Sequence, residues 1–230
     1  MPNDAAVVTG SSSGIGRAIA QALLDAGWSV TGLDLAPAAI EHPRFRAVAV
    51  DLSDASATDA VASSLVGANA FVHVAGVLRV GTLGALQAEH AELMWKLHVA
   101  AAERIANALL PAMAEAGQGR VVLVGSRVAQ GKAGRSQYAA TKAALNGMAR
   151  SWAAEVVARG VTVNVVSPAA TQTAMTDDPA RQAAAPVLPP IGRLIQPEEI
   201  AALVLFLLSP AAAAITGQDI AICGGASLPR

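Results

Sequence analysis

The chain has 230 residues, of which 53% are hydrophobic and 14% are charged, and its formal net charge is -1. This composition excludes a disordered chain and supplies enough apolar side chains for the core of one fairly large domain. A charge so close to neutral gives no basic surface for nucleic acid or for a membrane, so we expect neither as a partner. Cys223 is the single cysteine, which excludes an internal disulfide and favours a cytoplasmic location. We also expect no signal peptide and no membrane-spanning segment.

Short runs rich in β-branched residues alternate along the chain with longer stretches rich in alanine and leucine. We expect strands at 5–10, 29–34, 46–52, 69–76, 120–126, 161–168 and 217–223. We expect helices at 14–27, at roughly 85–115, at 136–160 and at 197–208. The strands lack clean polar alternation, as strands of a parallel sheet do when helices cover both of its faces. The β-α-β order therefore predicts one domain over residues 1–230, an α/β fold with a doubly wound parallel sheet of about seven strands.

The segment 169–195 fits neither a helix nor a strand and is rich in alanine, proline, threonine and glutamine. It follows the sixth expected strand, so it begins at the carboxyl edge of the sheet, where ligands bind in this architecture. We expect it to form a small lid over a substrate.

A glycine-rich turn with Gly10, Gly14 and Gly16 joins the first expected strand to the first expected helix. Such a turn lets the backbone approach a pyrophosphate, which then lies on the positive end of the helix. The next expected strand ends at Asp34, whose carboxylate can accept hydrogen bonds from a ribose diol and would repel a 2′-phosphate. The sequence therefore predicts a Rossmann-like dinucleotide site that prefers NAD to NADP. The alternative is that Asp34 is a solvated turn residue.

Tyr138 is the only tyrosine of the chain, and Lys142 follows it by four residues in an expected helix. Residues four apart share a helix face, so the phenol and the ammonium are expected side by side. An ammonium beside a phenol favours ionisation and lowers the pKa of the phenol from its ordinary value of about 10. Tyr138 is therefore a candidate general acid or base, and Ser126 is a candidate to hold the substrate oxygen. The alternative is a packing tyrosine beside a surface lysine.

Several motifs resemble those of the short-chain dehydrogenase/reductase family: the three glycines, Tyr138 four residues before Lys142, and Ser126 twelve residues before Tyr138. The resemblance covers essentially the whole chain and implies a nicotinamide cofactor, with the ribose of its nicotinamide on Lys142. It also implies that Thr173, or less strongly Thr171, holds the carboxamide. The further cofactor-binding positions that it implies are Ser12, Ser13, Ile15, Asp51, Leu52, Ala75, Gly76 and Pro168.

The chain departs from the pattern of this family at three positions. His98 stands where the family usually has an asparagine of a water-linked proton relay. A histidine can also hold a water, and its ordinary pKa of about 6.5 would make the rate depend on pH near neutrality. The alternative is a packed helix histidine without a catalytic role. His73 replaces an asparagine and is expected to supply a structural hydrogen bond, and Ala169 replaces a glycine near the nicotinamide.

Several cations, Arg79, Arg127, Lys132 and Arg135, lie in two loops expected at the carboxyl edge of the sheet. They suggest an anionic substrate, such as a carboxylate held by arginine through two hydrogen bonds, although each could instead be solvated. The segments "AGVLRVGTL" and "ITGQDIAICGGASL" resemble the dihydroxybenzoate branch of the family, which implies NAD-dependent oxidation of a cyclic dihydrodiol carboxylic acid. We therefore expect hydride transfer between the nicotinamide and a small secondary alcohol or diol, or its ketone.

Two other functions compete with this one. A 3-oxoacyl reductase would normally prefer NADPH and would need a cation near the position of Asp34. A nucleotide-binding regulator without catalysis would have no need of the intact Ser126, Tyr138 and Lys142. No metal is expected in any of these functions.

The expected helices at 91–113 and 136–159 carry apolar residues on more than one face. One face covers the sheet, and the other needs a partner. We therefore expect a homo-oligomer, either a dimer or, as the resemblance implies, a tetramer.

Overall fold

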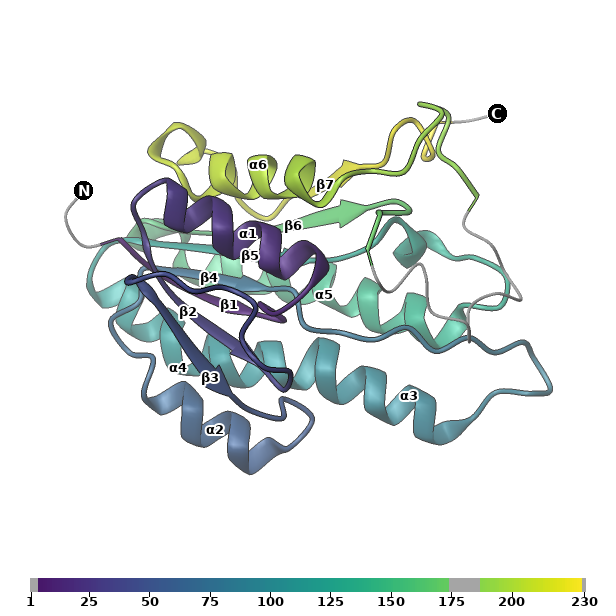
Figure 1. Cartoon of the computed structure of the whole chain (residues 1–230), viewed down its shortest axis with the longest axis horizontal. Helices are drawn as coiled ribbons and strands as arrows, with labels where there is room; N and C mark the ends of the chain where they lie inside the picture. The colour runs from purple at the N-terminus through teal and green to yellow at the C-terminus, as the bar shows by residue number, and fades with distance from the viewer. Residues whose placement is uncertain (1–3, 174–186, 229–230) are drawn as a thin grey trace.

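The computed structural model describes residues 4–173 and 187–228, which contain a seven-stranded sheet. The strands are β1 (Ala5–Thr9), β2 (Ser29–Asp34), β3 (Phe45–Ala49), β4 (Ala70–His73), β5 (Gly119–Val124), β6 (Val161–Pro168) and β7 (Asp219–Ile222). Neighbouring strands are parallel, in the order β3-β2-β1-β4-β5-β6-β7 (Figure 1). The direction of winding reverses between β1 and β4, so the predicted doubly wound sheet is confirmed.

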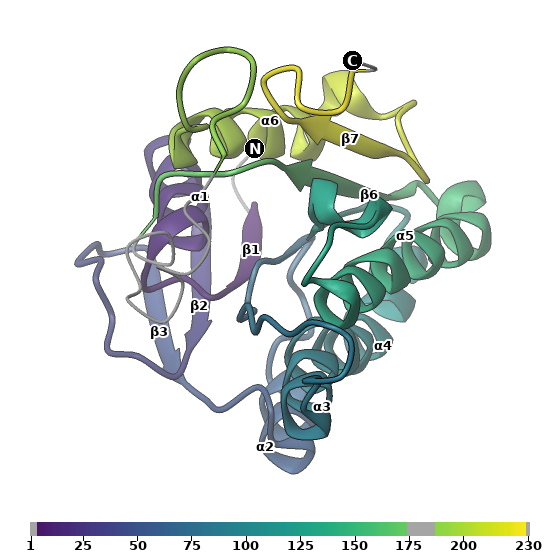
Figure 2. The same ribbon diagram turned by 90° about the vertical axis from the view of Figure 1, so that its right-hand side faces the viewer.

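Helices cover both faces of this sheet, with α1 and α6 on one side and α2, α4 and α5 on the other (Figure 2). The α-helices are α1 (Gly14–Asp25), α2 (Ala55–Ser63), α3 (Ala88–Trp95), α4 (Ala101–Glu115), α5 (Ser136–Val156) and α6 (Pro197–Leu208). Shorter turns are the π-helix η1 (Lys96–Ala100) and the 3-10 helices η2 (Arg127–Gln130), η3 (Val157–Arg159) and η6 (Pro210–Ala212). In this part of the chain, no helix is both long enough and apolar enough to cross a membrane.

Two adjacent residues of β1 show that both faces of the sheet are buried. Val8 belongs to the core on the α1 side, together with Ile19. Val7 belongs to the core on the opposite side, together with Ile105 of α4 and Leu145 of α5. Successive side chains of a strand point to opposite faces, so a strand covered on both sides buries neighbouring residues, whereas the edge strand β3 leaves Arg46 exposed.

Helix α2 was not expected from the sequence, because its apolar pattern is weak and only Thr58 and Ala62 of its residues are buried. Its start is set by Asp54, whose Oδ1 accepts hydrogen bonds from the amides of Ser56 at 2.8 Å and Ala57 at 3.0 Å. A capping carboxylate of this kind satisfies amides that the helix itself leaves unpaired.

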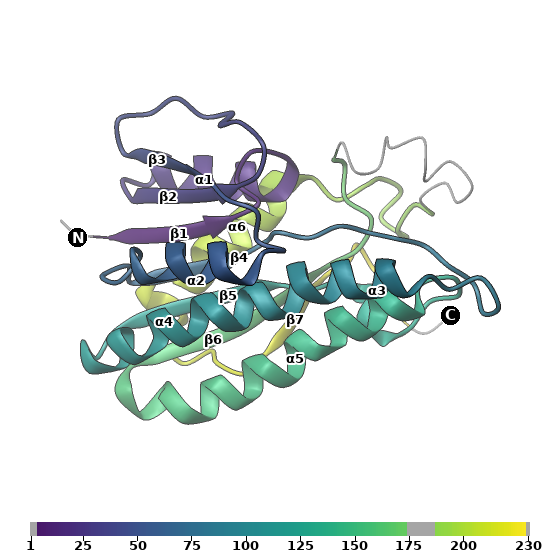
Figure 3. The ribbon, with the colours of Figure 1, turned by 90° about the horizontal axis from the view of Figure 1, so that it is seen from below.

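The single helix expected over roughly 85–115 is instead two α-helices, α3 and α4, joined by the π-turn η1. In this turn the amide of Ala101 bonds to the carbonyl of Lys96, five residues earlier. A π-turn inserts one extra residue into a helix and often marks a functional position. Figure 3 shows the composite helix running alongside α5.

The carboxyl ends of the parallel strands gather at one edge of the sheet, and the predicted site residues follow them there. Thr171 and Ile195 pair as an isolated bridge, so the two ends of the predicted lid lie side by side. Residues 174–186 of that segment lie outside the described residues.

Candidate active site

Glycines shape the turn after β1. Gly10 and Gly14 have φ of +67° and +51°, in the left-handed region that favours glycine. A Cβ on Gly16 would collide with the carbonyl oxygen of Gly10, so the start of α1 packs directly on the turn. The side chain of Ser13, the N-cap of α1, makes no capping hydrogen bond, and Ile15 packs beside the core. This geometry fits a pyrophosphate at the positive end of α1.

Asp34 lies beside this turn, at the end of β2. Its Oδ2 accepts a hydrogen bond from the amide of Ser12 at 2.9 Å, and its Oδ1 accepts one from the amide of Ala36 at 2.9 Å. Two backbone donors therefore fix the carboxylate next to the glycine turn. Each oxygen has a second lone pair for a ribose hydroxyl, so the local geometry fits the predicted role in cofactor choice.

Lys142 is buried on α5, and its Nζ donates a hydrogen bond to the carbonyl of Val124 at 2.9 Å. Burial disfavours the charged ammonium and lowers the pKa of Lys142 to about 8. The Nζ lies 5.9 Å from the centre of the Tyr138 ring, on the preceding turn of the helix. The structure thus brings the phenol and the lysine together as their spacing predicts.

Ser126 follows β5 and caps the short helix η2, where its Oγ accepts a hydrogen bond from the amide of Val128 at 3.2 Å. The residue is 9% exposed. The strand itself ends at Val124, two residues before the serine, so the hydroxyl stands on a loop beyond the sheet. As a donor, this hydroxyl remains able to bind a substrate oxygen.

His98 is fully buried within the π-turn. Its Nε2 accepts a hydrogen bond from the amide of Val77 at 3.0 Å, and its Nδ1 lies 2.8 Å from Oγ1 of Thr141. Its ring meets the ring of Tyr138 edge-on, with 5.5 Å between their centres. Both ring nitrogens are thus engaged within the chain, which does not fit the predicted binding of a relay water by this side chain.

The electrostatics of His98 also differ from the sequence-based expectation. Burial, followed by the charge of Lys142, holds the pKa of His98 well below its ordinary value of 6.5. The ring is therefore neutral at physiological pH, and it gives no cause for a pH dependence of the rate near neutrality.

The remaining implied cofactor residues lie around the same edge. Thr173 faces the glycine turn, because a Cβ on Gly14 would lie 3.1 Å from its Cγ2. Thr171 is buried and donates a hydrogen bond to the carbonyl of Ala169 at 3.0 Å. Further positions on loops or strand ends of this edge are Asp51, Leu52, Ala75, Gly76 and Pro168. Asp51 is exposed and accepts two hydrogen bonds from Ser53, at 2.8 and 2.7 Å, whereas Leu52 is buried.

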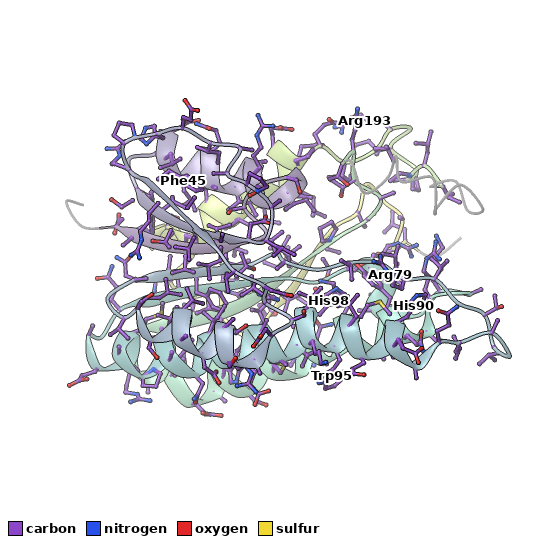
Figure 4. All side chains as sticks on the ribbon, turned by 60° about the horizontal axis from the view of Figure 1, so that its bottom comes forward. Phe45, Arg79, His90, Trp95, His98 and Arg193 are labelled. Atoms are coloured by element: carbon purple, nitrogen blue, oxygen red, sulfur yellow. The ribbon has the colours of Figure 1, made fainter. Side chains whose placement is uncertain are left out.

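The two predicted cationic loops meet at this edge, because Gly81 and Arg135 pair as an isolated bridge. Arg79 and Arg135 each donate a hydrogen bond to the carbonyl that precedes them, of Leu78 at 3.2 Å and Gly134 at 3.4 Å. In Figure 4 Arg79 and His98 are labelled to the right of Phe45, which begins β3. Arg127 opens η2 directly after Ser126.

The structure also reveals hydrogen-bonding groups that the sequence analysis missed. Thr141 and Val77 hold the two nitrogens of His98. The hydroxyl of Thr9 bonds to His73 at 3.0 Å and accepts the amides of Val74 and Ala75. In the sequence, only the two unusual histidines could have indicated this network, because its other residues are typical of buried strands and helices.

Comparison with known proteins places this geometry in a family. The model of the family described as enoyl-(acyl carrier protein) reductase matches residues 10–227. A 3-oxoacyl-[acyl-carrier-protein] reductase of Vibrio cholerae is 36% identical over 234 residues, which cover 96% of each chain. The chain belongs to the short-chain dehydrogenase/reductase family. The membership of this family, predicted from the glycine turn, Ser126, Tyr138 and Lys142, is thereby confirmed.

Other short-chain dehydrogenases and reductases agree with this assignment. A 2,3-dihydro-2,3-dihydroxybenzoate dehydrogenase of Escherichia coli is 34% identical over 238 residues, which cover 96% of each chain. A solved structure described as a short chain dehydrogenase/reductase family protein has a TM-score of 0.86, 30% identity and 98% coverage of both chains. The protein is therefore an oxidoreductase of this family, and the roles of its individual site residues remain predictions.

Proposed function

We propose that this enzyme is an NAD-dependent dehydrogenase of a small secondary alcohol or diol that carries a carboxylate. The observation that carries this proposal is the grouping of Tyr138, Lys142 and Ser126 at the same sheet edge as the glycine turn and Asp34. When bound, the nicotinamide supplies the acceptor or donor of the hydride.

Tyr138 acts as the general base that removes the proton of the alcohol, or as the general acid that returns it to a ketone. The ammonium of Lys142 favours the phenolate because an opposite charge within a buried site is weakly screened. Ser126 donates its hydroxyl to the substrate oxygen and stabilises the charge that develops there. Lys142 also binds the ribose of the nicotinamide, and Thr173 or Thr171 holds the carboxamide.

The choice of NAD rests on Asp34. Its carboxylate is fixed by the amides of Ser12 and Ala36, and a 2′-phosphate beside it would face uncompensated repulsion. The relatives named as 3-oxoacyl reductases support a second candidate function, the reduction of a 3-oxoacyl thioester. In that case Asp34 would have to tolerate NADPH, which separates the two candidates.

The proposed carboxylate partner is an arginine of the two bridged loops, Arg79 or Arg135, with Arg127 as a third candidate. A guanidinium forms two parallel hydrogen bonds with a carboxylate, which would orient the substrate towards Tyr138. Arg79→Gln is expected to raise the KM for a carboxylated diol by about tenfold and to leave the KM for its methyl ester unchanged. An equal change in KM for the acid and for its methyl ester would contradict the proposed contact between Arg79 and the carboxylate.

Absorbance of reduced nicotinamide tests the proposed function. The purified protein is offered NAD or NADP with cyclic diols and secondary alcohols, each as a free acid and as a methyl ester, and NADPH with a 3-oxoacyl thioester. We expect reduction of NAD by a carboxylated cyclic diol. Turnover confined to NADPH and the thioester would establish the reductase, and tight nucleotide binding without any turnover would favour a regulator.

We also propose that the enzyme works as a homo-oligomer, a dimer or tetramer. The composite helix and α5 form the walls of an open, mostly apolar groove of about 310 Å³, and Trp95 in its wall is 50% exposed. The groove is lined by Trp95, Val99, Glu103, Ala144, Met148 and Trp152. A second copy would bury this face. Sedimentation at micromolar concentration is expected to show the oligomer, and a monomer would contradict it.

A further inference from the structure

Two imidazoles, those of His73 and His98, are fully buried next to the helix that carries Tyr138. We propose that both are positioning residues: two neutral rings of opposite tautomer that lock the π-turn η1 and tie Val77 to Thr141 beside Tyr138. Their effect on catalysis rests on the proposed function, because the position of Tyr138 matters only if the enzyme transfers a proton. Their tautomers can be tested without any substrate.

The π-turn leaves one backbone carbonyl, that of Leu97, without its usual partner in the helix. In a regular α-helix the amide of Ala101 would bond to the carbonyl of Leu97, but here it bonds to that of Lys96. The released carbonyl of Leu97 lies 3.1 Å from Nε2 of His73, which comes from β4. The carbonyl of His98 is a second backbone partner of the same ring. A side chain of the sheet thus compensates for the bond that the helix gives up.

The tautomer of His73 follows from its partners. A carbonyl only accepts, so Nε2 carries the hydrogen that bonds to Leu97. The hydroxyl oxygen of Thr9 already accepts the amides of Val74 and Ala75, so its hydrogen points to Nδ1 of His73. A proton added at Nδ1 would face this hydroxyl hydrogen, and the network would have to break.

The tautomer of His98 is the opposite one. The amide of Val77 only donates, so Nε2 is an acceptor without a hydrogen. Nδ1 therefore carries the hydrogen and donates to Oγ1 of Thr141, whose own hydrogen goes to the carbonyl of Tyr138 at 2.9 Å. The chain of donors runs in one direction, from the loop after β4 to the backbone of Tyr138.

Burial opposes protonation of either ring, and the charge of Lys142 opposes it as well. The ammonium of Lys142 on α5 lowers the pKa of both imidazoles, and His73 also lowers that of His98. An imidazolium here would be a second buried cation beside the ammonium that bonds to Val124. The rings therefore hold groups in place and do not carry protons.

Gly76 adds a steric constraint on the same ring. A Cβ at this position would lie 2.6 Å from both Cδ2 and Nε2 of His98. The backbone after β4 therefore touches the imidazole, and a larger residue would push the ring away from Val77 and Thr141. An asparagine at position 98 is smaller and leaves more room.

Nitrogen NMR of the full-length protein, labelled at its four histidines, tests the tautomers directly. Two-bond proton–nitrogen correlations identify which ring nitrogen carries the hydrogen. We expect one ring fixed as the Nε2–H form and lost in His73→Asn, and one fixed as the Nδ1–H form and lost in His98→Asn. Both patterns should persist between about pH 5.5 and 9. An imidazolium pattern for His73 or His98, or the same tautomer in both of these rings, would overturn the proposal.

Kinetics then separate positioning from proton transfer. His98→Leu removes both hydrogen bonds and is expected to lower kcat by about 100-fold, with NADH affinity within about twofold of the wild type. His98→Asn retains a donor and an acceptor and should recover most of kcat, without altering the pH profile. If kcat falls equally in both variants and the acidic or basic side of the pH profile of kcat disappears, His98 carries a proton and the positioning role is wrong.

A double-mutant cycle tests the contact with Gly76. Gly76→Ala should lower kcat in the wild-type background and have a clearly smaller effect in the His98→Asn background, because the ring that the methyl group strikes is then absent. Independent effects of the two substitutions would contradict the proposed contact. If no substrate is found, the NMR result still decides the tautomers. Failure of the proposed function is therefore distinguishable from failure of this proposal.

Discussion

The two halves of the sheet build their parts of the site by different means. In the half formed by β1 to β3, backbone groups make the site: glycines allow a close turn, and amides of Ser12 and Ala36 hold Asp34. In the half formed by β4 to β6, buried side chains make it: Lys142, His98 and His73 each bond to partners deep in the fold.

Because of this difference, the two halves are expected to respond differently to amino-acid substitutions. A site made of backbone groups depends on space and on φ, so few positions in it are sensitive, and these are glycines or the residue that the backbone holds. A site made of buried polar side chains depends on complete hydrogen bonding, so removal of one partner affects its neighbours. The predictions below separate the two kinds of site.

The largest effect is expected in the side-chain half. Tyr138→Phe removes the hydroxyl that we propose transfers the proton, and kcat should fall by about 1000-fold or more. The affinity for NADH should stay within about twofold, because the variant keeps Lys142, Asp34 and the glycine turn as the proposed partners of the nucleotide. Steady-state rates and NADH fluorescence measure both quantities, and parallel losses would show that the two halves are not separable.

The stability of the enzyme is expected to depend on the protonation of Lys142. Because burial lowers its pKa from 10.5 to about 8, the unfolded chain binds more protons than the folded chain between these pH values. The free energy of unfolding should therefore rise with pH across this window relative to Lys142→Met, by about 3 kcal/mol in all. Urea denaturation at a series of pH values measures it, and a difference independent of pH would contradict the buried ammonium.

In the backbone half, a substitution of Asp34 is expected to change which cofactor the enzyme prefers. Asp34→Arg replaces a repulsive charge by a partner for a 2′-phosphate, and the ratio of NAD to NADP affinity should fall by about 100-fold. The kcat with a saturating cofactor should change little, since the catalytic side chains lie in the other half. An unchanged ratio in a folded variant would remove Asp34 from cofactor choice.

The smallest effects concern glycines. Gly16→Ala places a methyl group against the carbonyl of Gly10 and should destabilise the protein by about 1–3 kcal/mol. Gly147→Ala is the matched control, because its Cβ meets no atom within 4 Å on α5, and it should stabilise by about 0.5–1 kcal/mol. Thermal unfolding compares the two variants. Equal changes in melting temperature would mean that the close contact between Gly16 and Gly10 does not restrict the residue at position 16.

The sequence predicts the backbone half more completely than the side-chain half. A turn such as that of Gly10 and Gly16 requires glycine at fixed spacing, and the spacing is visible in the sequence. The order of the strands follows from the alternation of strands and helices, which is a local pattern. The start of α2 was missed because a single cap at Asp54 and a weak apolar face carry little periodic signal.

The buried network was beyond sequence reasoning. Thr9, His73 and the carbonyl of Leu97 come from β1, β4 and η1 and meet only in the folded chain. The π-turn that releases this carbonyl leaves no composition or spacing signal in an alanine-rich helix. For the same reason His98 looked able to bind a water, although both of its nitrogens are used within the fold.

A crystal structure of the enzyme with NADH tests most directly the claim that the two halves meet on one cofactor. We expect the adenine ribose hydroxyls on Asp34, the pyrophosphate on the turn from Gly10 to Gly16, and the nicotinamide beside Tyr138 and Ser126. The rings of His73 and His98 should keep the partners described above. A nicotinamide placed away from Tyr138, or a ribose that does not touch Asp34, would contradict this account.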